Sequence, residues 1–197
     1  KSANPNATVL LAGMAGMQPN SYRYWRDFFL TNRQWGDLGN MHSAQDAQKD
    51  AVDFNVKAYR TYLDGLGNES RTFWITRVIV GTPEVDGWTD DQKARMAIVG
   101  YAQAFANGAQ RIFHDNGQES EFQLVVEMID GFESVERLSE TSVKFEFPKK
   151  TVYVLWDEAT LPEEVSGKVE VVRYDGTREK KKAQEVNADV PLFVIAK

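Results

Sequence analysis

The two histidines of this chain are the first residues whose types point to chemistry. His42 and His114 each close a short stretch with the pattern of a strand, and Asp115 follows the second histidine directly. Imidazole nitrogens and a carboxylate are ligands that a zinc ion accepts. No further ligand has a recognisable metal-site spacing, so we favour hydrogen-bonding roles for these residues and expect no metal and no cofactor.

A guanidinium and two carboxylates lie close together in the sequence and form a second group. Arg77 lies within an apolar strand-like run, and Glu84 and Asp86 belong to the loop that follows it. A carboxylate can act as an acid, a base or a nucleophile, whereas a guanidinium is always protonated and binds anions. We interpret Glu84 and Asp86 as ordinary loop carboxylates. For Arg77, pairing with a neighbouring acid is favoured over binding a carboxylate or phosphate ligand.

Four strand–helix units are predicted in the first 130 residues or so. Long apolar runs alternate there with segments whose apolar residues recur at helical spacing, and Thr89 with Gln92 fits a capping box. Such alternation implies a parallel sheet, either a small doubly wound domain or half of an eight-fold barrel. The predicted strands are Ala7–Met14, Trp35–Met41, Thr72–Val80 and Arg111–His114, and the helices are Tyr22–Leu30, Asp46–Leu63, Asp90–Asn107 and Glu119–Ile129.

After Gly131 the apolar pattern changes from helical to alternating, which predicts antiparallel strands. Val152, Val154 and Trp156 should share one face and pack on Phe193 and Ile195. The lysine-rich run at 178–182 is interpreted as the solvated face of a hairpin. The predicted strands are Ser142–Phe147, Lys150–Trp156, Gly167–Tyr174 and Pro191–Ala196.

Composition excludes several classes of protein. The net charge of −6 disfavours nucleic acid or an anionic membrane as the main partner. The chain lacks cysteine, which rules out disulfides and thiolate metal sites, and no apolar run approaches the roughly 20 residues of a membrane span. Neither a phosphate-binding glycine loop nor the Gly-x-Ser-x-Gly elbow of serine hydrolases is present.

A series of strings resembles retaining glycoside hydrolases built on the eight-fold β/α barrel. The strings occur in the family's order over nearly the whole chain. They resemble the fifth to eighth barrel strands, the helix after the seventh strand, and the first and last strands of the β-domain often fused behind such barrels. These are Asn4–Gly13, Asp37–Ser43, Phe73–Arg77, Arg111–Asn116, Thr89–Gly108, Thr151–Trp156 and Pro191–Ile195.

The resemblance also implies where the chemistry of the family should lie. Retaining glycosidases need two carboxyl groups roughly 5 Å apart. In the family the acid/base ends the fourth strand, which would precede Lys1, and the nucleophile follows a Trp-x-Thr sequence in the seventh strand. Here Trp74-Ile75-Thr76 is followed by Arg77, which cannot attack carbon. Both carboxylates of the pair are therefore expected to be absent from this chain.

From these observations we expect a half barrel at 1–133 and a small sandwich-like all-β domain at 134–197. The expected function is that of a glycoside-hydrolase-like, carbohydrate-associated pseudoenzyme outside the cell or at its surface. The alternatives are one part of a split or truncated glycosidase, in which Glu84 or Asp86 substitutes in catalysis, and a structural assembly protein. A second copy or another polypeptide is the expected partner. The residues expected to bind substrate are Asn40, His42, Trp88, His114 and Asp115. Trp88 has a second interpretation, as the hydrophobic staple before the helix at 90–107. Trp74 is interpreted as a core residue.

Overall fold

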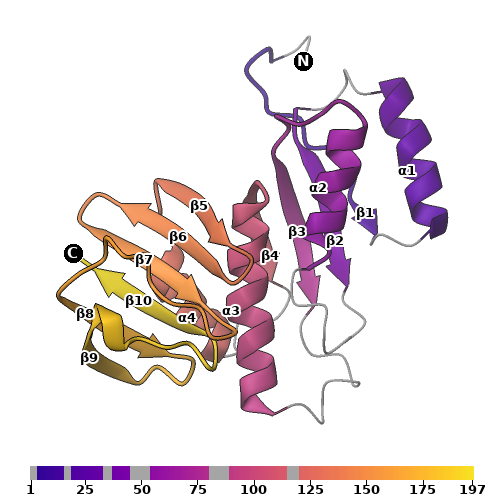
Figure 1. The fold of residues 1–197 in the computed structure, drawn as a ribbon. Helices are drawn as coiled ribbons and strands as arrows, with labels where there is room; N and C mark the ends of the chain where they lie inside the picture. Colours follow the sequence, from indigo (N-terminus) through magenta and orange to yellow (C-terminus); the bar gives the residue numbers. More distant parts are fainter. Residues whose placement is uncertain (1–3, 16–18, 33–36, 45–53, 80–88, 115–119) are drawn as a thin grey trace.

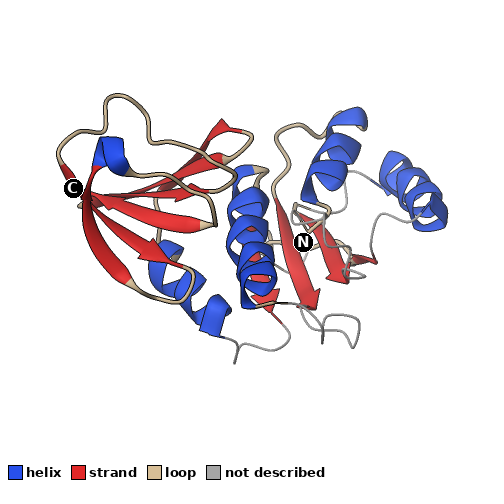
Figure 2. Ribbon diagram, turned by 60° about the horizontal axis from the view of Figure 1, so that its bottom comes forward, coloured by secondary structure: helices blue, strands red, loops and turns tan. Residues whose placement is uncertain are grey.

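The computed structural model describes residues 4–15, 19–32, 37–44, 54–79, 89–114 and 120–197. Two sheets make up this part of the chain, and helix α3 (Asp90–Ala106) lies between them (Figure 1 and Figure 2). The first sheet is parallel and the second is antiparallel. The chain is therefore a mixed α/β protein in which the two types of sheet follow one another along the sequence.

The parallel sheet has its four strands in sequence order, β1-β2-β3-β4. A helix follows each strand, which confirms the strand–helix alternation predicted from the sequence. The strands are β1 (Met14–Ala15), β2 (Gly39–Ala44), β3 (Phe73–Ile79) and β4 (Ala109–His114), and the helices are α1 (Pro19–Asn32), α2 (Val56–Gly65), α3 and α4 (Ser120–Ile129).

The first strand is much shorter than predicted. Only Met14 and Ala15 form regular strand. Leu10 forms an isolated bridge with Leu38, the residue before β2, and the Leu11 N–H donates to the Leu38 carbonyl. The N–H of Val9 donates instead to the Asp37 carboxylate at 2.7 Å. Because this side-chain acceptor replaces a strand carbonyl, the ladder is interrupted and the segment is extended without being a continuous strand.

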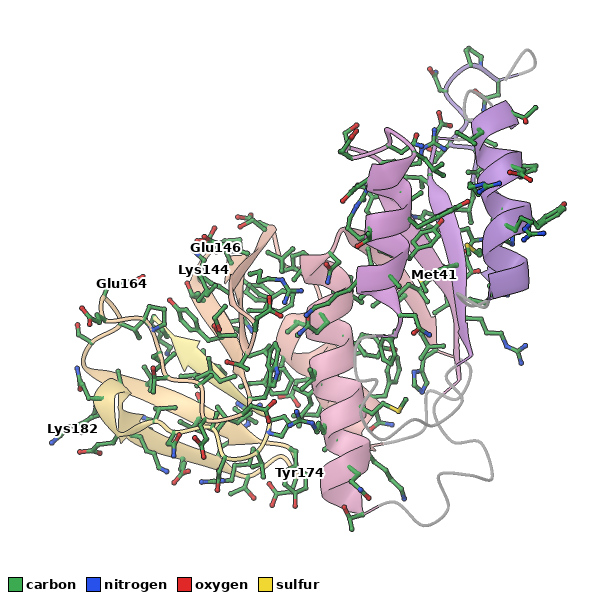
Figure 3. The ribbon with its side chains drawn as sticks, turned by 45° about the vertical axis from the view of Figure 1, so that its right-hand side comes forward. Met41, Lys144, Glu146, Glu164, Tyr174 and Lys182 are labelled. Atoms are coloured by element: carbon green, nitrogen blue, oxygen red, sulfur yellow. The ribbon has the colours of Figure 1, made fainter. Side chains whose placement is uncertain are left out.

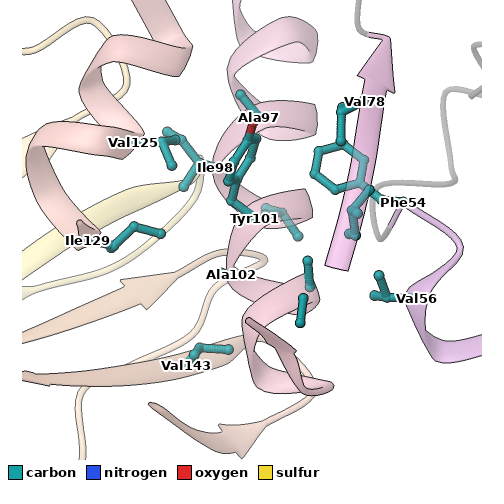
Figure 4. Packing of buried hydrophobic residues seen from close by; sticks show 14 of the residues in the cluster. Phe54, Val56, Val78, Ala97, Ile98, Tyr101, Ala102, Val125, Ile129 and Val143 are labelled. Carbon is teal, nitrogen blue, oxygen red and sulfur yellow. The ribbon is translucent and has the colours of Figure 1, made fainter. Parts of the chain in front are cut away.

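Helix α3 begins at the predicted capping box. The Thr89 hydroxyl accepts from the Gln92 N–H, and the Gln92 side chain accepts from the Thr89 N–H. Both flanks of the helix are buried in one continuous hydrophobic cluster (Figure 4). Phe54 and Val78 lie on the side of the parallel sheet, and Val125 of α4 lies on the opposite side.

One glycine of α3 is required by this packing. A Cβ at Gly100 would lie 2.6 Å from the ring of Phe54, a distance that real contacts do not reach. The bare backbone therefore lets the fully buried Phe54 ring lie directly on the helix.

The antiparallel part is one hydrogen-bonded sheet of six strands, so the expectation of a sandwich-like domain is wrong for the described residues. Strand β10 pairs with β7 on one side and β8 on the other, which joins the two halves into one layer. The strand order is β5-β6-β7-β10-β8-β9. The strands are β5 (Ser134–Ser139), β6 (Ser142–Phe147), β7 (Lys150–Leu155), β8 (Lys168–Arg173), β9 (Arg178–Lys182) and β10 (Leu192–Ala196), and a 3-10 turn, η2 (Ala183–Glu185), follows β9.

The two faces of this sheet are covered differently. Val152, Val154, Trp156 and Phe193 belong to the cluster that includes α3, with Ile195 packed against it, which confirms the predicted shared face. The other face has its own cluster, closed by residues of the loops at 159–165 and 183–188. These loops therefore cover the face that a second sheet would cover in a sandwich.

Strand β5 was not predicted, whereas the run that forms β9 was predicted as the solvated face of a hairpin. Both are edge strands rich in charge. Lys144 of β6 bridges Glu136 and Glu146, and such side chains lie around the periphery of the antiparallel sheet (Figure 3). The run at 178–182 is strand β9, paired with β8 behind the turn at Asp175 and Gly176, so it is one strand of a hairpin as expected. Charged edges of this kind resist pairing with other chains.

Candidate functional site

The parallel sheet has one face toward its helices and one face away from them. On the helix side, the Tyr59 ring of α2 contacts Phe73 at 5.0 Å, and the Tyr101 hydroxyl of α3 lies 3.0 Å from Nδ1 of His114. Neighbouring residues of a strand point to opposite faces. Trp74 and Phe113 therefore lie on the face away from α2 and α3, which we call the open face.

Asn40 is the buried polar residue of the open face and joins three segments. Its side chain is 6% exposed. Its Nδ2 donates to the Leu11 carbonyl at 3.0 Å, and its Oδ1 accepts from the Thr76 hydroxyl at 2.7 Å. The amide is thereby fixed between β2, β3 and the segment before β1.

Behind Asn40, a buried tyrosine supports the backbone of β2. The Tyr59 hydroxyl donates to the Asn40 carbonyl at 3.3 Å, and burial raises the pKa of this phenol, which keeps it a neutral donor. A Cβ at Gly39 would lie 2.8 Å from the Tyr59 oxygen. Glycine at this position therefore lets the hydroxyl reach the strand.

His42 and Arg77 are register partners near the carboxyl ends of β2 and β3. The register shifts between Met41 and His42, so Thr76 is the extra residue of a bulge and Arg77 takes the place opposite the histidine. The His42 ring lies against Gly13, where an added Cβ would meet its Nε2 at 2.3 Å. Arg77 is exposed and has an interaction partner of its own.

An aromatic and cationic group lies beside the polar one. The ring centroids of Trp74 and Phe113 are 5.9 Å apart, and the Arg111 guanidinium carbon lies 5.3 Å from the centroid of Trp74. Trp74 is only partly buried, so its interpretation as a core residue is wrong. Its Nε1 is shielded from solvent and has no hydrogen-bond partner among the residues that the structure describes. Alternation along β3 and β4 is the sequence signal that could have placed these residues together.

The second histidine lies on the opposite face. His114 stacks on Phe122 of α4, with ring centroids 4.5 Å apart, in addition to its contact with Tyr101. The structure therefore brings Asn40 and His42 to one face and places His114 among the helices. Glu84, Asp86, Trp88 and Asp115 lie outside the described residues, and within those residues no three potential ligands gather in a way that could hold a metal ion.

Comparisons with known proteins bear on the fold. No protein-family model matches this chain, and no curated protein matches it. Its structure is similar to a glucosidase from Croceicoccus marinus, with a TM-score of 0.57 and 11% identity over 100% of this chain and 61% of that one. A β-xylosidase from Caulobacter crescentus CB15 gives a TM-score of 0.59 and 9% identity over 98% and 62% of the two chains.

A third similar structure is the endoglucanase Cel44A from Clostridium thermocellum, with a TM-score of 0.54 and 10% identity over 100% and 58% of the chains. The fold is glycosidase-like. At these identities the likeness concerns the fold alone, because one fold supports many activities. The chain spans about three fifths of the length of these structures.

The likeness agrees with the family resemblance of the sequence strings at the level of fold. The likeness gives no information on catalytic residues, because it concerns the fold alone. Among the described residues, no helix is both long and apolar enough to cross a membrane.

Proposed function

We propose that this chain is the carboxyl-terminal half of a retaining-glycosidase-like barrel with a trailing β-domain, and that it binds carbohydrate without hydrolysing it. The observation that carries the proposal is the position of Arg77. It lies on β3, the strand that resembles the nucleophile strand of the family, opposite His42 on the neighbouring strand. A permanent cation there cannot form a glycosyl–enzyme bond, yet it can donate hydrogen bonds to hydroxyl or carboxylate oxygens.

The order of the parallel strands supports the half-barrel part of the proposal. Four parallel strands in sequence order, each followed by a helix, are the repeating unit of the eight-fold barrel, whereas a doubly wound sheet reverses its strand order. Sites in such barrels lie at the carboxyl ends of the strands. His42 and Arg77 lie near those ends. Asn40 lies two residues before His42 on β2, and therefore on the same face of the sheet.

The residues proposed to bind sugar are Asn40, His42, Trp88, His114 and Asp115. Support from the described contacts is strongest for Asn40 and His42, which share the open face. For His114, the contacts with Tyr101 and Phe122 favour an indirect role through the end of β4. An extracellular or cell-surface location is part of the proposal and rests on the family resemblance.

Calorimetric titration with two neutral probes, cellohexaose and xylohexaose, tests the binding. We expect a measurable Kd for at least one probe and at least a tenfold weaker Kd for His42→Ala. The matched control is Tyr24→Ala, which removes an exposed aromatic side chain from α1. Absence of binding to both probes contradicts the proposal, as does an unchanged Kd in His42→Ala.

A further inference from the structure

A groove of about 690 Å³ runs along β4. Six consecutive residues, Gly108–Phe113, line it, so the strand borders the groove over nearly its whole length. The opposite wall comes from α3, α4 and the segment that leads into β5, with Phe105, Phe122 and Phe132 among its apolar side chains. No residue of β3 lines the groove, because β3 pairs with the other edge of β4.

Two residues with large exposed apolar side chains line this groove, Phe113 from the open-face side of β4 and Val126 from α4. Phe113 is 47% exposed and Val126 is 42% exposed, and both line it. Each Å² of apolar surface left in water costs roughly 25 cal/mol. Contiguous apolar surface of this kind on a folded chain marks a contact surface.

The backbone of β4 offers a second reason for a partner. Within the described residues β4 pairs only with β3, and at the far side of the sheet β1 pairs only with β2. The unpaired N–H and C=O groups of such edges are a template for another strand. Because all four strands run in the same direction, the β1 edge of one sheet can continue the β4 edge of an identical sheet in parallel.

We propose that this groove is the interface between two copies of the chain, and that it receives the segment Val9–Ala15 of the other copy. That segment ends with β1 and its free edge, is apolar, and is connected to the neighbouring segment by the hydrogen bond from the Leu11 N–H to the Leu38 carbonyl. In a dimer with two-fold symmetry the same contact forms twice, because the β1 edge of each copy pairs with the β4 edge of the other. All four edges are then paired, and the two sheets close into one ring of eight strands.

The two-fold arrangement makes the same contact twice, which enlarges the interface. Stable interfaces bury about 1,200–2,000 Å² in total. The two-fold arrangement fills two grooves and also covers the open faces, where Trp74 and Phe113 lie. The carboxyl ends of the strands stay accessible at one end of the ring, so the interface does not depend on carbohydrate binding and does not prevent it.

Sedimentation velocity over 1 to 100 µM (a range on the order of typical dimer affinities) tests the proposal. We expect a species of twice the 22.3 kDa chain mass. Phe113→Lys and Val126→Lys should each raise the dimer Kd at least tenfold, because a lysine in the groove must lose its hydration. The matched control is Leu30→Lys, which places the same charge at an exposed apolar site on α1 and should leave the Kd unchanged. Circular dichroism verifies that each variant is folded.

Cysteine cross-linking tests the orientation of the two copies, since the chain has no cysteine of its own. Ala12→Cys and Phe113→Cys chains, mixed and treated with a short bis-maleimide, should cross-link to each other in preference to themselves. A monomer at every concentration overturns the proposal. A dimer that survives both lysine variants overturns it too, as does exclusive cross-linking of Phe113→Cys to itself.

Discussion

The Thr76 hydroxyl donates a 2.7 Å hydrogen bond to Oδ1 of Asn40 across the pair β2 and β3. The other end of the same amide donates to the Leu11 carbonyl. Asn40 is buried, so both of its polar ends have partners where water cannot replace them. This fixed amide orders the open face directly before His42 and Arg77.

Thr76→Val should lower the free energy of unfolding by about 1–3 kcal/mol, because the isosteric side chain leaves the Asn40 oxygen without its donor. Urea denaturation monitored by tryptophan fluorescence measures the change. Thr76→Ser is the control, since it retains the hydroxyl and should recover most of the stability. Equal stability of the valine variant and the wild type would mean that the hydrogen bond contributes nothing.

Residues 1–197 should not hydrolyse aryl β-glycosides, because Arg77 cannot serve as a nucleophile and because β1 to β4 correspond, in the proposal, to the fifth to eighth strands of the family, whose acid/base lies on the fourth. Release of p-nitrophenol from aryl glucoside and xyloside measures turnover. Arg77→Glu alone should not create activity, since only one carboxylate of the pair would be present. Wild-type turnover contradicts this expectation. If it disappears in Glu84→Gln or Asp86→Asn, the loop carboxylates are the substitutes, and if it survives both changes, the site lies elsewhere.

Trp156→Ala should cost about 3–5 kcal/mol of stability, because its side chain is 2% exposed and packs in the cluster shared by α3 and the antiparallel sheet. Chemical denaturation gives the difference. Trp156→Phe is the matched control, since it keeps an aromatic ring in the same space and should lose clearly less. A loss below about 1 kcal/mol for the alanine variant would place the side chain outside the core.

Arg95 of α3 and Asp157 after β7 form a bidentate ion pair, in which both guanidinium nitrogens donate to the carboxylate oxygens at 2.7 Å. The hydrogen bond from Arg95 is the main cause that lowers the pKa of the Asp157 carboxyl below its usual range. A lowered folded-state pKa stabilises the fold above the unfolded value of about 3.9. That contribution disappears as the pH falls through the lower folded-state pKa.

Asp157→Asn should therefore reduce stability near neutral pH by at most about 1 kcal/mol, since both side chains are partly exposed to solvent. The difference from wild type should shrink as the pH falls below the unfolded value of about 3.9 and disappear once the pH passes the lower folded-state pKa of Asp157. Thermal unfolding at several pH values measures it, and Asp175→Asn is the control for a carboxylate without an arginine hydrogen bond. A difference that persists unchanged at acid pH contradicts the ion-pair explanation.

Local patterns in the sequence predicted those features that depend on neighbouring residues. The Thr89 and Gln92 capping box, the strand Ser142–Phe147 and the buried face of Trp156 are all as the residues indicated. Each depends on spacing along one segment, where the geometry of a helix or strand fixes which side chains share a side. Arg77 was singled out differently, by the resemblance of Trp74-Ile75-Thr76 to the seventh strand of the glycosidase family.

Tertiary structure decided what depends on pairing between distant segments. Alternation gives a strand two faces but does not say which one a helix covers, so His42 and His114, similar in sequence context, lie on opposite faces. Strand register decides the bulge that places Arg77 opposite His42. Strand pairing decides the position of β10 between β7 and β8. Sequence by itself determined the alternation of strands and helices, the start of α3 and the shared face of Val152, Val154 and Trp156. Only the packing of α2 and α3 on one face determined which side chains line the other.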